Sequence, residues 1–154
     1  LQSPHIEKEE IDNSLKTLLE EGVLTYKEPG SYCKPSRNDD HFDKYSSLCN
    51  ICEPSVKRFY IAMSVLWSQN NISKEKLQTD CDLIAKELER LEGWPYPEFS
   101  DKTKFRNFIE LLINERYIKV NKELLSASKI TLKAQDSYKV FFDKKFLELI
   151  QNIN

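Results

Sequence analysis

Glycine, histidine and long apolar runs are scarce in this sequence, and each shortage excludes a class of function. The three glycines, Gly22, Gly30 and Gly93, stand far apart, so no glycine-rich loop that could cradle a phosphate is present. The longest apolar stretch, residues 59–67, is interrupted by Ser64 and is far shorter than the roughly 20 residues that a membrane-spanning helix requires. The chain begins with Leu1 and has no leader pattern, which predicts a piece of a longer protein.

Catalytic residue types are scarce as well. Nucleophilic catalysis with a base usually needs a histidine close to a hydroxyl or thiol group, and the chain has only His5 and His41. Asp43 follows His41 at a spacing that occurs by chance in polar loops. Paired carboxylates such as Glu20 and Glu21 fall on exposed helix faces. The sequence therefore predicts no catalytic, cofactor-binding or metal-binding residue.

Four cysteines are too few to form the disulfide framework of a secreted protein of 154 residues, which favours reduced thiols. Cys49 and Cys52 form a Cys-x-x-Cys motif, but a zinc site normally needs a second pair of ligands, and none follows at a comparable spacing. Val56 and Phe59 continue the helical spacing of the two cysteines. We therefore expect both thiols to pack in the apolar seam of a helix.

The composition is that of a helix-rich, soluble protein of one domain or two small lobes. Hydrophobic residues make up 40% and charged residues 31% of the chain, and the mean hydropathy is −0.59. The net charge is −4 for residues 1–50, −2 for residues 51–100 and +4 for residues 101–154. Because nucleic-acid-binding domains usually have an isoelectric point above about 9, the value of 5.8 for this chain argues against a nucleic-acid partner.

The periodicity of apolar residues predicts a mainly α fold, a helical bundle with short β-hairpin or wing elements. A seam of Leu77, Cys81, Ile84, Leu88 and Leu91 predicts one helix, capped by Ser73 and ended by Gly93. Pro54 should bend or restart the helix over residues 45–68, whose continuous part is expected to begin near Glu53. An amphipathic helix is expected over residues 7–21, and further helices over 45–68 and 73–93, from about 101 with Ser100 or Asp101 as its cap, and from about 143. Strands are expected over 23–26 and 117–120, and a loop over 29–43.

Two segments, 94 residues apart, both read as a helix that runs into a strand: residues 15–24 and 109–118. Helix-then-strand units of this kind end winged-helix modules. The sequence therefore predicts two winged-helix-like units flanking two longer helices, with possible lobes over 1–44 and 45–154. An alternative function follows, a winged-helix-like module for protein or nucleic-acid interaction.

A series of more specific motifs runs along most of the chain. It comprises Leu18–Leu24, Glu53–Tyr60 with its Arg58-Phe59-Tyr60 step, Ile84–Leu88 with Leu91 and Gly93, the turn Pro97-Glu98-Phe99 with Asp101-Lys102, Phe105, Leu112 and Tyr117-Ile118. Together these motifs resemble the C-terminal region of bacterial membrane glycerol-3-phosphate 1-O-acyltransferases. Ser100 stands where the family's turn has a second phenylalanine, and Arg116 where the family has glycine.

This resemblance implies an enzyme that transfers an acyl group from acyl-CoA or acyl-carrier protein to the 1-hydroxyl of glycerol 3-phosphate. The product is lysophosphatidate, made at the cytoplasmic side of the bacterial inner membrane. The family's His-x-x-x-x-Asp motif is not reproduced after His5 or His41, and its Glu-Gly-Thr-Arg motif is absent. Residues 1–154 are therefore expected to form a non-catalytic C-terminal domain, a scaffold or regulatory part whose partner is the substrate-binding catalytic domain of the same polypeptide.

Two surfaces of such a domain can be named from the sequence. Aromatic residues between two prolines could dock onto the catalytic domain, because rigid rings lose little entropy on burial; they are Trp94, Tyr96 and Phe99. The alternative is that they cap the domain's own core. A basic end could meet anionic headgroups through Lys139, Lys144 and Lys145, with Phe141, Phe142 and Phe146 inserting shallowly.

Overall fold

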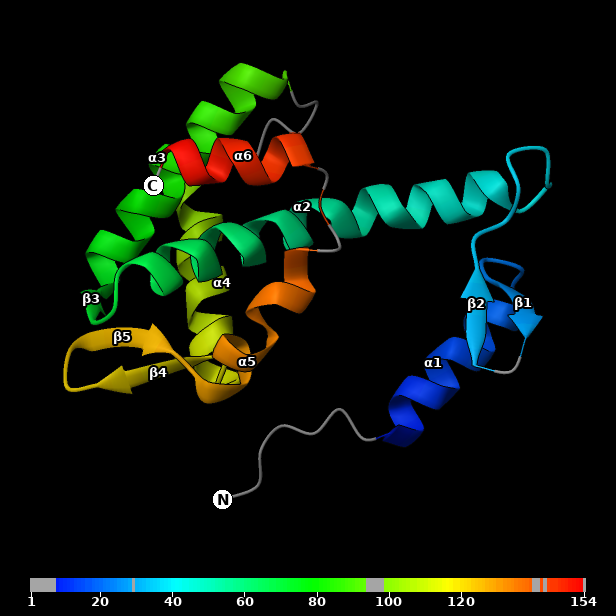
Figure 1. The fold of residues 1–154 in the computed structure, drawn as a ribbon, viewed down its shortest axis with the longest axis horizontal. Coiled ribbons are helices and arrows are strands. Elements are labelled where there is room, and N and C mark those ends of the chain that lie inside the picture. Colours follow the sequence, from blue (N-terminus) through cyan, green and yellow to red (C-terminus); the bar gives the residue numbers. More distant parts are fainter. Residues whose placement is uncertain (1–7, 29, 94–98, 140–141, 143, 154) are drawn as a thin grey trace. The chain divides into compact units, whose positions relative to one another are not determined.

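The computed structural model describes residues 8–28, 30–93, 99–139, 142 and 144–153 (Figure 1). The chain divides into two compact units, Leu1–Glu53 (unit 1) and Pro54–Asn154 (unit 2). The division falls inside a helix, whereas the sequence suggested lobes that meet after residue 44. The structure is mainly helical with short antiparallel strand pairs, which confirms the predicted fold class.

Unit 1 contains helix α1 (Lys8–Glu20), a hairpin of β1 (Thr25–Glu28) and β2 (Ser31–Cys33), and the first part of α2 (Phe42–Ser68). Strand β2 lies where a loop was expected. It has no apolar alternation, and it is held instead by antiparallel pairing with β1. Tyr26 and Tyr32 are paired across the hairpin with ring centroids 5.3 Å apart, a cross-strand contact that stabilises short sheets.

Helix α2 runs without interruption through Pro54, so the expected restart near Glu53 is wrong. Proline removes one backbone donor and strains the preceding turn, and the burial of the following turns offsets this cost. Every residue from Tyr60 to Leu66 is buried, which is typical of a helix surrounded by its own domain. Cys49 and Cys52 are exposed, and the expected thiol seam is therefore wrong: the buried part of the helix begins only later.

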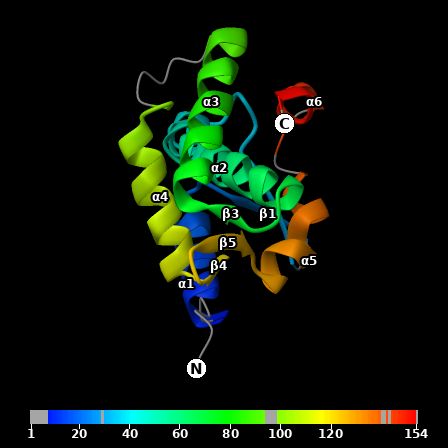
Figure 2. The same ribbon diagram turned by 90° about the vertical axis from the view of Figure 1, so that its left-hand side faces the viewer.

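Unit 2 continues from α2 with β3 (Ile72–Ser73), α3 (Lys74–Glu92), α4 (Lys102–Asn114), β4 (Ile118–Asn121), β5 (Leu124–Ala127), α5 (Lys129–Tyr138) and α6 (Lys144–Ile153). Its antiparallel sheet has the order β3-β5-β4. Helix, strand, two helices and a two-stranded hairpin follow one another in this unit. The long helices α2 and α3 are part of this arrangement, whereas the sequence predicted two winged-helix-like units flanking the two longer helices. Figures 1 and 2 both place the β4–β5 hairpin at the C-terminal end of α4, next to α5.

The helix ends of unit 2 follow the predicted capping chemistry. The Ser73 side chain accepts a hydrogen bond from the backbone N–H of Lys76 at 3.2 Å, and Gly93 ends α3 in the left-handed conformation with φ +61°. Asp101 caps α4 by accepting from the N–H of Thr103 at 2.7 Å. The seam of α3 is buried from Leu77 to Leu88, but its expected last member, Leu91, is 42% exposed.

The two helix-to-strand turns have the same backbone geometry, 94 residues apart. Gly22 (φ +69°) and Arg116 (φ +61°) occupy the left-handed position after α1 and α4. The next N–H closes each turn: Val23 donates to Leu18 at 2.8 Å, and Tyr117 donates to Leu112 at 2.9 Å. This is the hydrogen bond of a Schellman helix end, so the similarity seen in the sequence extends to the backbone.

Candidate interaction surfaces

The motifs that are far apart in the sequence meet in the core of unit 2. Phe99 is fully buried and packs edge-to-face on Phe105, with ring centroids 6.3 Å apart. Arg58, two residues before the buried run of α2, lies over the Phe99 ring at 5.3 Å and donates from Nε to the Phe99 carbonyl at 3.3 Å. Burial lowers the pKa of Arg58, and the charges of Asp101 and Glu89 oppose that shift.

Two more contacts complete this arrangement. Phe59 and Tyr117 pack edge-to-face with centroids 5.7 Å apart. Ser100, which replaces the expected phenylalanine, donates its hydroxyl to the Glu89 carboxylate at 2.7 Å and its N–H at 2.9 Å. These motif residues therefore hold α2, α3, α4 and β4 together, and their chemistry is that of packing.

Of the three aromatic residues predicted to dock onto the catalytic domain, the structure describes only Phe99. Phe99 lies in the core of its own unit, which agrees with the alternative reading in which it caps that core. Trp94 and Tyr96 lie outside the described residues, so docking through these two side chains stays a prediction.

The predicted membrane-contact residues take several positions in unit 2. Lys139 pairs with Asp136 at 2.8 Å, and this hydrogen bond raises the pKa of Lys139. Lys144 pairs with Glu148 at 3.1 Å on the exposed side of α6, and Lys145 is exposed.

The aromatic members of that prediction are used in packing. The Phe142 ring stacks on Phe146 with centroids 4.8 Å apart and lies 4.5 Å from the ring centroid of Tyr60. Phe146 is buried, whereas Phe141 lies outside the described residues. Contact of the three lysines with lipid stays a prediction. Phe146 is buried in the core of unit 2, so its ring is not exposed for insertion into lipid.

The polar and titratable side chains of the described residues do not come together in a reaction centre. No group of three or more His, Cys, Asp or Glu side chains in this part of the chain could hold a metal ion. His41 is exposed, and its ring covers Gly22 so closely that a Cβ atom there would lie 2.6 Å from Cγ of the imidazole. Burial raises the pKa of the Cys81 thiol, which keeps this thiol protonated and unreactive. Within the described ranges, no helix is both long enough and apolar enough to cross a membrane.

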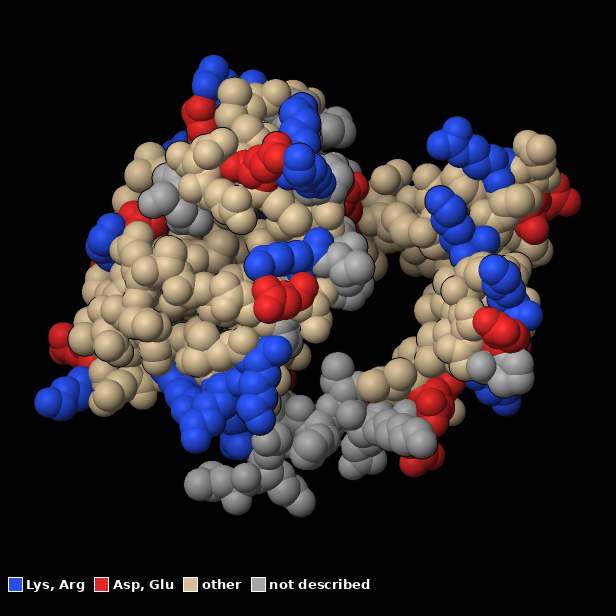
Figure 3. Space-filling model, in the orientation of Figure 1, with Lys and Arg blue, Asp and Glu red and all other residues tan. Residues whose placement is uncertain are grey.

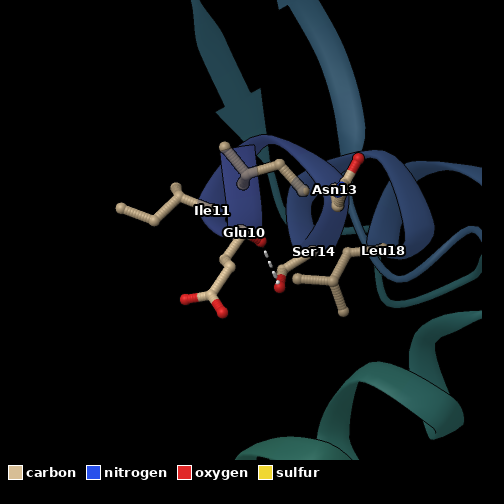
Figure 4. Close-up of a pocket in the computed structure, with 6 residues that line it drawn as sticks. Glu10, Ile11, Asn13, Ser14 and Leu18 are labelled. Carbon is tan, nitrogen blue, oxygen red and sulfur yellow. Dashed lines mark hydrogen bonds between the residues drawn. The ribbon is translucent and has the colours of Figure 1, made fainter. Parts of the chain in front are cut away.

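One open depression lies along α1 in unit 1 (Figure 4). Its lining consists of Glu10, Ile11, Asn13, Ser14, Leu15 and Leu18. The Ser14 hydroxyl donates to the Glu10 carbonyl at 2.8 Å, a local bond that satisfies the hydroxyl within the helix. The depression therefore offers aliphatic contact area rather than a nucleophile.

The aliphatic side of α1 is only partly covered. Ile11, Leu15 and Leu18 recur at helical spacing on one face, and Ile11 is 47% exposed. In the described part of unit 1 only Val23 and Pro35 are buried. The spacing of its apolar residues predicts that α1 is amphipathic but does not indicate a candidate surface, because a sequence does not show which faces remain uncovered.

Comparisons with known proteins give a consistent answer. A family model described as "Glycerol-3-phosphate acyltransferase C-terminal region" matches residues 2–121. The "Glycerol-3-phosphate acyltransferase" of Pseudomonas fluorescens (strain SBW25) is 36% identical over 107 residues, which cover 68% of this chain and 13% of that protein. The protein of the same name from Pseudomonas putida (strain W619) is 37% identical over 109 residues, which cover 70% of this chain and 13% of that protein. No solved structure matches.

The chain thus spans about 13% of the length of the curated relatives that it matches. The matched region contains all of the motifs on which the resemblance was based, from Leu18 to Ile118. The comparisons favour the acyltransferase prediction over the winged-helix interaction module. The chain belongs to the family of glycerol-3-phosphate acyltransferase C-terminal regions.

Proposed function

We propose that this chain is the C-terminal scaffold or regulatory domain of a glycerol-3-phosphate 1-O-acyltransferase. The membership of the family carries the proposal. The relatives named glycerol-3-phosphate acyltransferase are far longer than this chain, which leaves most of their length for a catalytic domain. The core position of the motif residues supports a structural role for the region itself.

The whole enzyme would transfer an acyl group from acyl-CoA or acyl-carrier protein to the 1-hydroxyl of glycerol 3-phosphate, releasing lysophosphatidate. The catalytic domain would bind both substrates at the cytoplasmic side of the bacterial inner membrane. This domain would stabilise or orient that catalytic domain by packing against it, without contributing a residue to the chemistry.

The apolar face of α1 is the surface that supports docking best among the described residues. Ile11, Leu15 and Leu18 form an aliphatic stripe that unit 1 covers only partly. Burying the exposed half of a side chain such as Ile11 would stabilise a complex by roughly 1 kcal/mol. Trp94 and Tyr96 are proposed as a second contact with the same partner.

The test uses Ile11→Ser, made both in the 154-residue chain and in the full-length parent. Because Ile11 is half-exposed, the substitution should change the free energy of unfolding of the isolated chain by no more than about 0.5 kcal/mol. Lysophosphatidate formation by the parent should fall. Leu83→Ser is the matched control, since Leu83 is 58% exposed on α3, and it should leave both measurements unchanged.

Two results would contradict docking through α1. Parent activity that is unaffected by Ile11→Ser and by the more polar Ile11→Asp would show that the face is not used. An equal loss of activity with Leu83→Ser would show that the effect is not specific to α1.

A further inference from the structure

Basic side chains gather where α4, the β4–β5 hairpin and the start of α5 come together. The basic patch, as we call it, consists of Arg116, Lys119, Lys129 and Lys133, all of them exposed. Figure 3 shows a concentration of Lys and Arg over α5 at the edge of unit 2, where Asp and Glu are sparse. The first two residues flank the beginning of β4, and the last two lie one helical turn apart on α5.

Two hydrogen bonds bring these segments together. The carbonyl of Tyr117 accepts from the N–H of Ser128 at 3.0 Å and from the Thr131 hydroxyl at 3.3 Å. Ser128 is also the N-cap of α5. The first turn of α5 is therefore fastened to the residue that follows Arg116, which places the lysines of α5 beside the start of the hairpin.

The charges of the three lysines of the patch are not neutralised locally. Residues 115–133 carry five basic side chains, including Lys122, against two acidic ones, Glu115 and Glu123. Lys119, Lys129 and Lys133 form no ion pair with any residue that the structure describes. The lysines of α3 behave differently, because Lys76 and Lys86 pair with acidic residues on the same helix. Unpaired like charges of this kind favour an anionic partner.

Aliphatic side chains border the basic patch. Ile130 is 56% exposed and Leu132 is 47% exposed, and at 100° per residue they lie on either side of the two lysines of α5. On the hairpin, Leu124 is 41% exposed and is paired with Asn121, two residues after Lys119. Since facing residues and alternate residues share one face of a sheet, Leu124 and Lys119 lie on the same face.

We propose that the basic patch, together with Ile130, Leu132 and Leu124, binds a membrane surface that contains anionic lipid. Lysines near such a surface bind its headgroups, and adjoining aliphatic side chains enter the boundary with the acyl chains. Protein interfaces favour tryptophan, tyrosine and arginine as anchors, and the phosphate backbone of a nucleic acid offers no apolar surface to the three aliphatic side chains. Two of the four basic residues, Lys129 and Lys133, and all three aliphatic residues lie beyond residue 121, where the family match ends. The proposal therefore rests on this chain's own residues and not on its proposed function.

The experiment measures sedimentation of the 154-residue chain with vesicles. Vesicles of phosphatidylcholine and phosphatidylglycerol should bind the chain at low salt, and vesicles of phosphatidylcholine alone should bind it far less. Salt at about 1 M, where the Debye length is about 3 Å, should release it. Lys129→Gln with Lys133→Gln should weaken binding about 25-fold, or about fivefold for each lysine, and Ile130→Ser should weaken it about fivefold.

Matched controls separate this surface from a general effect of charge. Lys27→Gln with Lys34→Gln changes the net charge equally at exposed lysines of unit 1 and should leave vesicle binding nearly unchanged. Lys144→Gln with Lys145→Gln tests the lysines of α6 in the same way. Circular dichroism melting of each variant establishes that it is folded.

Three results would overturn the proposal. The first is that the chain fails to bind the anionic vesicles at low salt. The second is that the unit 1 or α6 control variant loses as much vesicle binding as the α5 variant. The third is that Ile130→Ser has no effect on vesicle binding while a short DNA duplex binds the chain as tightly as the vesicles do. The last result would assign the patch to nucleic acid instead of lipid.

Discussion

Arg116 occupies a backbone conformation that glycine adopts at no steric cost, so Arg116→Gly should stabilise unit 2. The residue has φ +61° at the end of α4, and the equivalent position after α1 is a glycine, Gly22. A left-handed conformation costs a residue with a Cβ atom about 1–2 kcal/mol. Replacing Arg116 with glycine relieves this strain. Part of the relief is offset because glycine loses about 0.5–1 kcal/mol more conformational entropy on folding. The net effect should be about 0.5–1 kcal/mol in favour of the variant.

Arg116→Ala is the control for the side chain. It removes the same guanidinium group but keeps the Cβ atom and therefore the strain. We expect the alanine variant to be no more stable than the unsubstituted chain, and the glycine variant to exceed the alanine variant by about 1 kcal/mol. The difference between the two variants isolates the backbone contribution from any interaction that the arginine makes.

Urea denaturation followed by tryptophan fluorescence measures this effect. Both tryptophans, Trp67 and Trp94, belong to unit 2, so the signal reports on the unit that contains Arg116. For a domain of about 100 residues, 1 kcal/mol also raises Tm by roughly 4–8 °C. Equal midpoints for the glycine and alanine variants would refute the assignment of strain to this position.

Three further outcomes follow from the structure. Gly22→Ala should destabilise unit 1 by more than Gly30→Ala, because both positions have positive φ but only the former would place a Cβ atom against a histidine ring; equal midpoints in a thermal melt would contradict this. Phe99→Ala should cost unit 2 about 3–5 kcal/mol in urea denaturation, as fully buried phenylalanines do, and a loss below about 1 kcal/mol would place that ring outside the core. Burial raises the pKa of Cys81, so this thiol stays protonated in the folded chain while it ionises in the unfolded one; stability should fall by up to about 1.4 kcal/mol per pH unit above pH 9, and Cys81→Ala should lack this contribution.

Local chemistry was sufficient to predict most helices of the fold. Ser73, Gly93 and Asp101 mark helix ends because a cap depends on the residue itself and on the next few backbone groups. The helix-to-strand turns at Gly22 and Arg116 were visible for the same reason. Cys49 and Cys52 show where such reasoning fails: their spacing continues an apolar seam, but both thiols are exposed. Periodicity indicates a face and does not show what covers it.

The elements that the sequence did not reveal depend on distant partners. Strand β5 reads Leu-Leu-Ser-Ala and is defined by its pairing with β3 and β4. Helix α5 exposes Ile130 and Leu132, so its apolar residues give no inward-facing stripe to recognise. The basic patch was signalled only by the positive charge of residues 101–154, because the hydrogen bonds to the Tyr117 carbonyl that assemble it are tertiary.

The role that we propose for this region is that of a non-catalytic but necessary part of a glycerol-3-phosphate acyltransferase. The most direct test measures lysophosphatidate formation from glycerol 3-phosphate and acyl-CoA in membranes that contain the full-length parent, with and without residues 1–154. We expect activity from the intact parent and its loss on truncation, while the truncated protein remains intact and membrane-bound. Full activity after truncation would contradict the scaffold role, and an inactive intact parent would contradict the proposed enzyme.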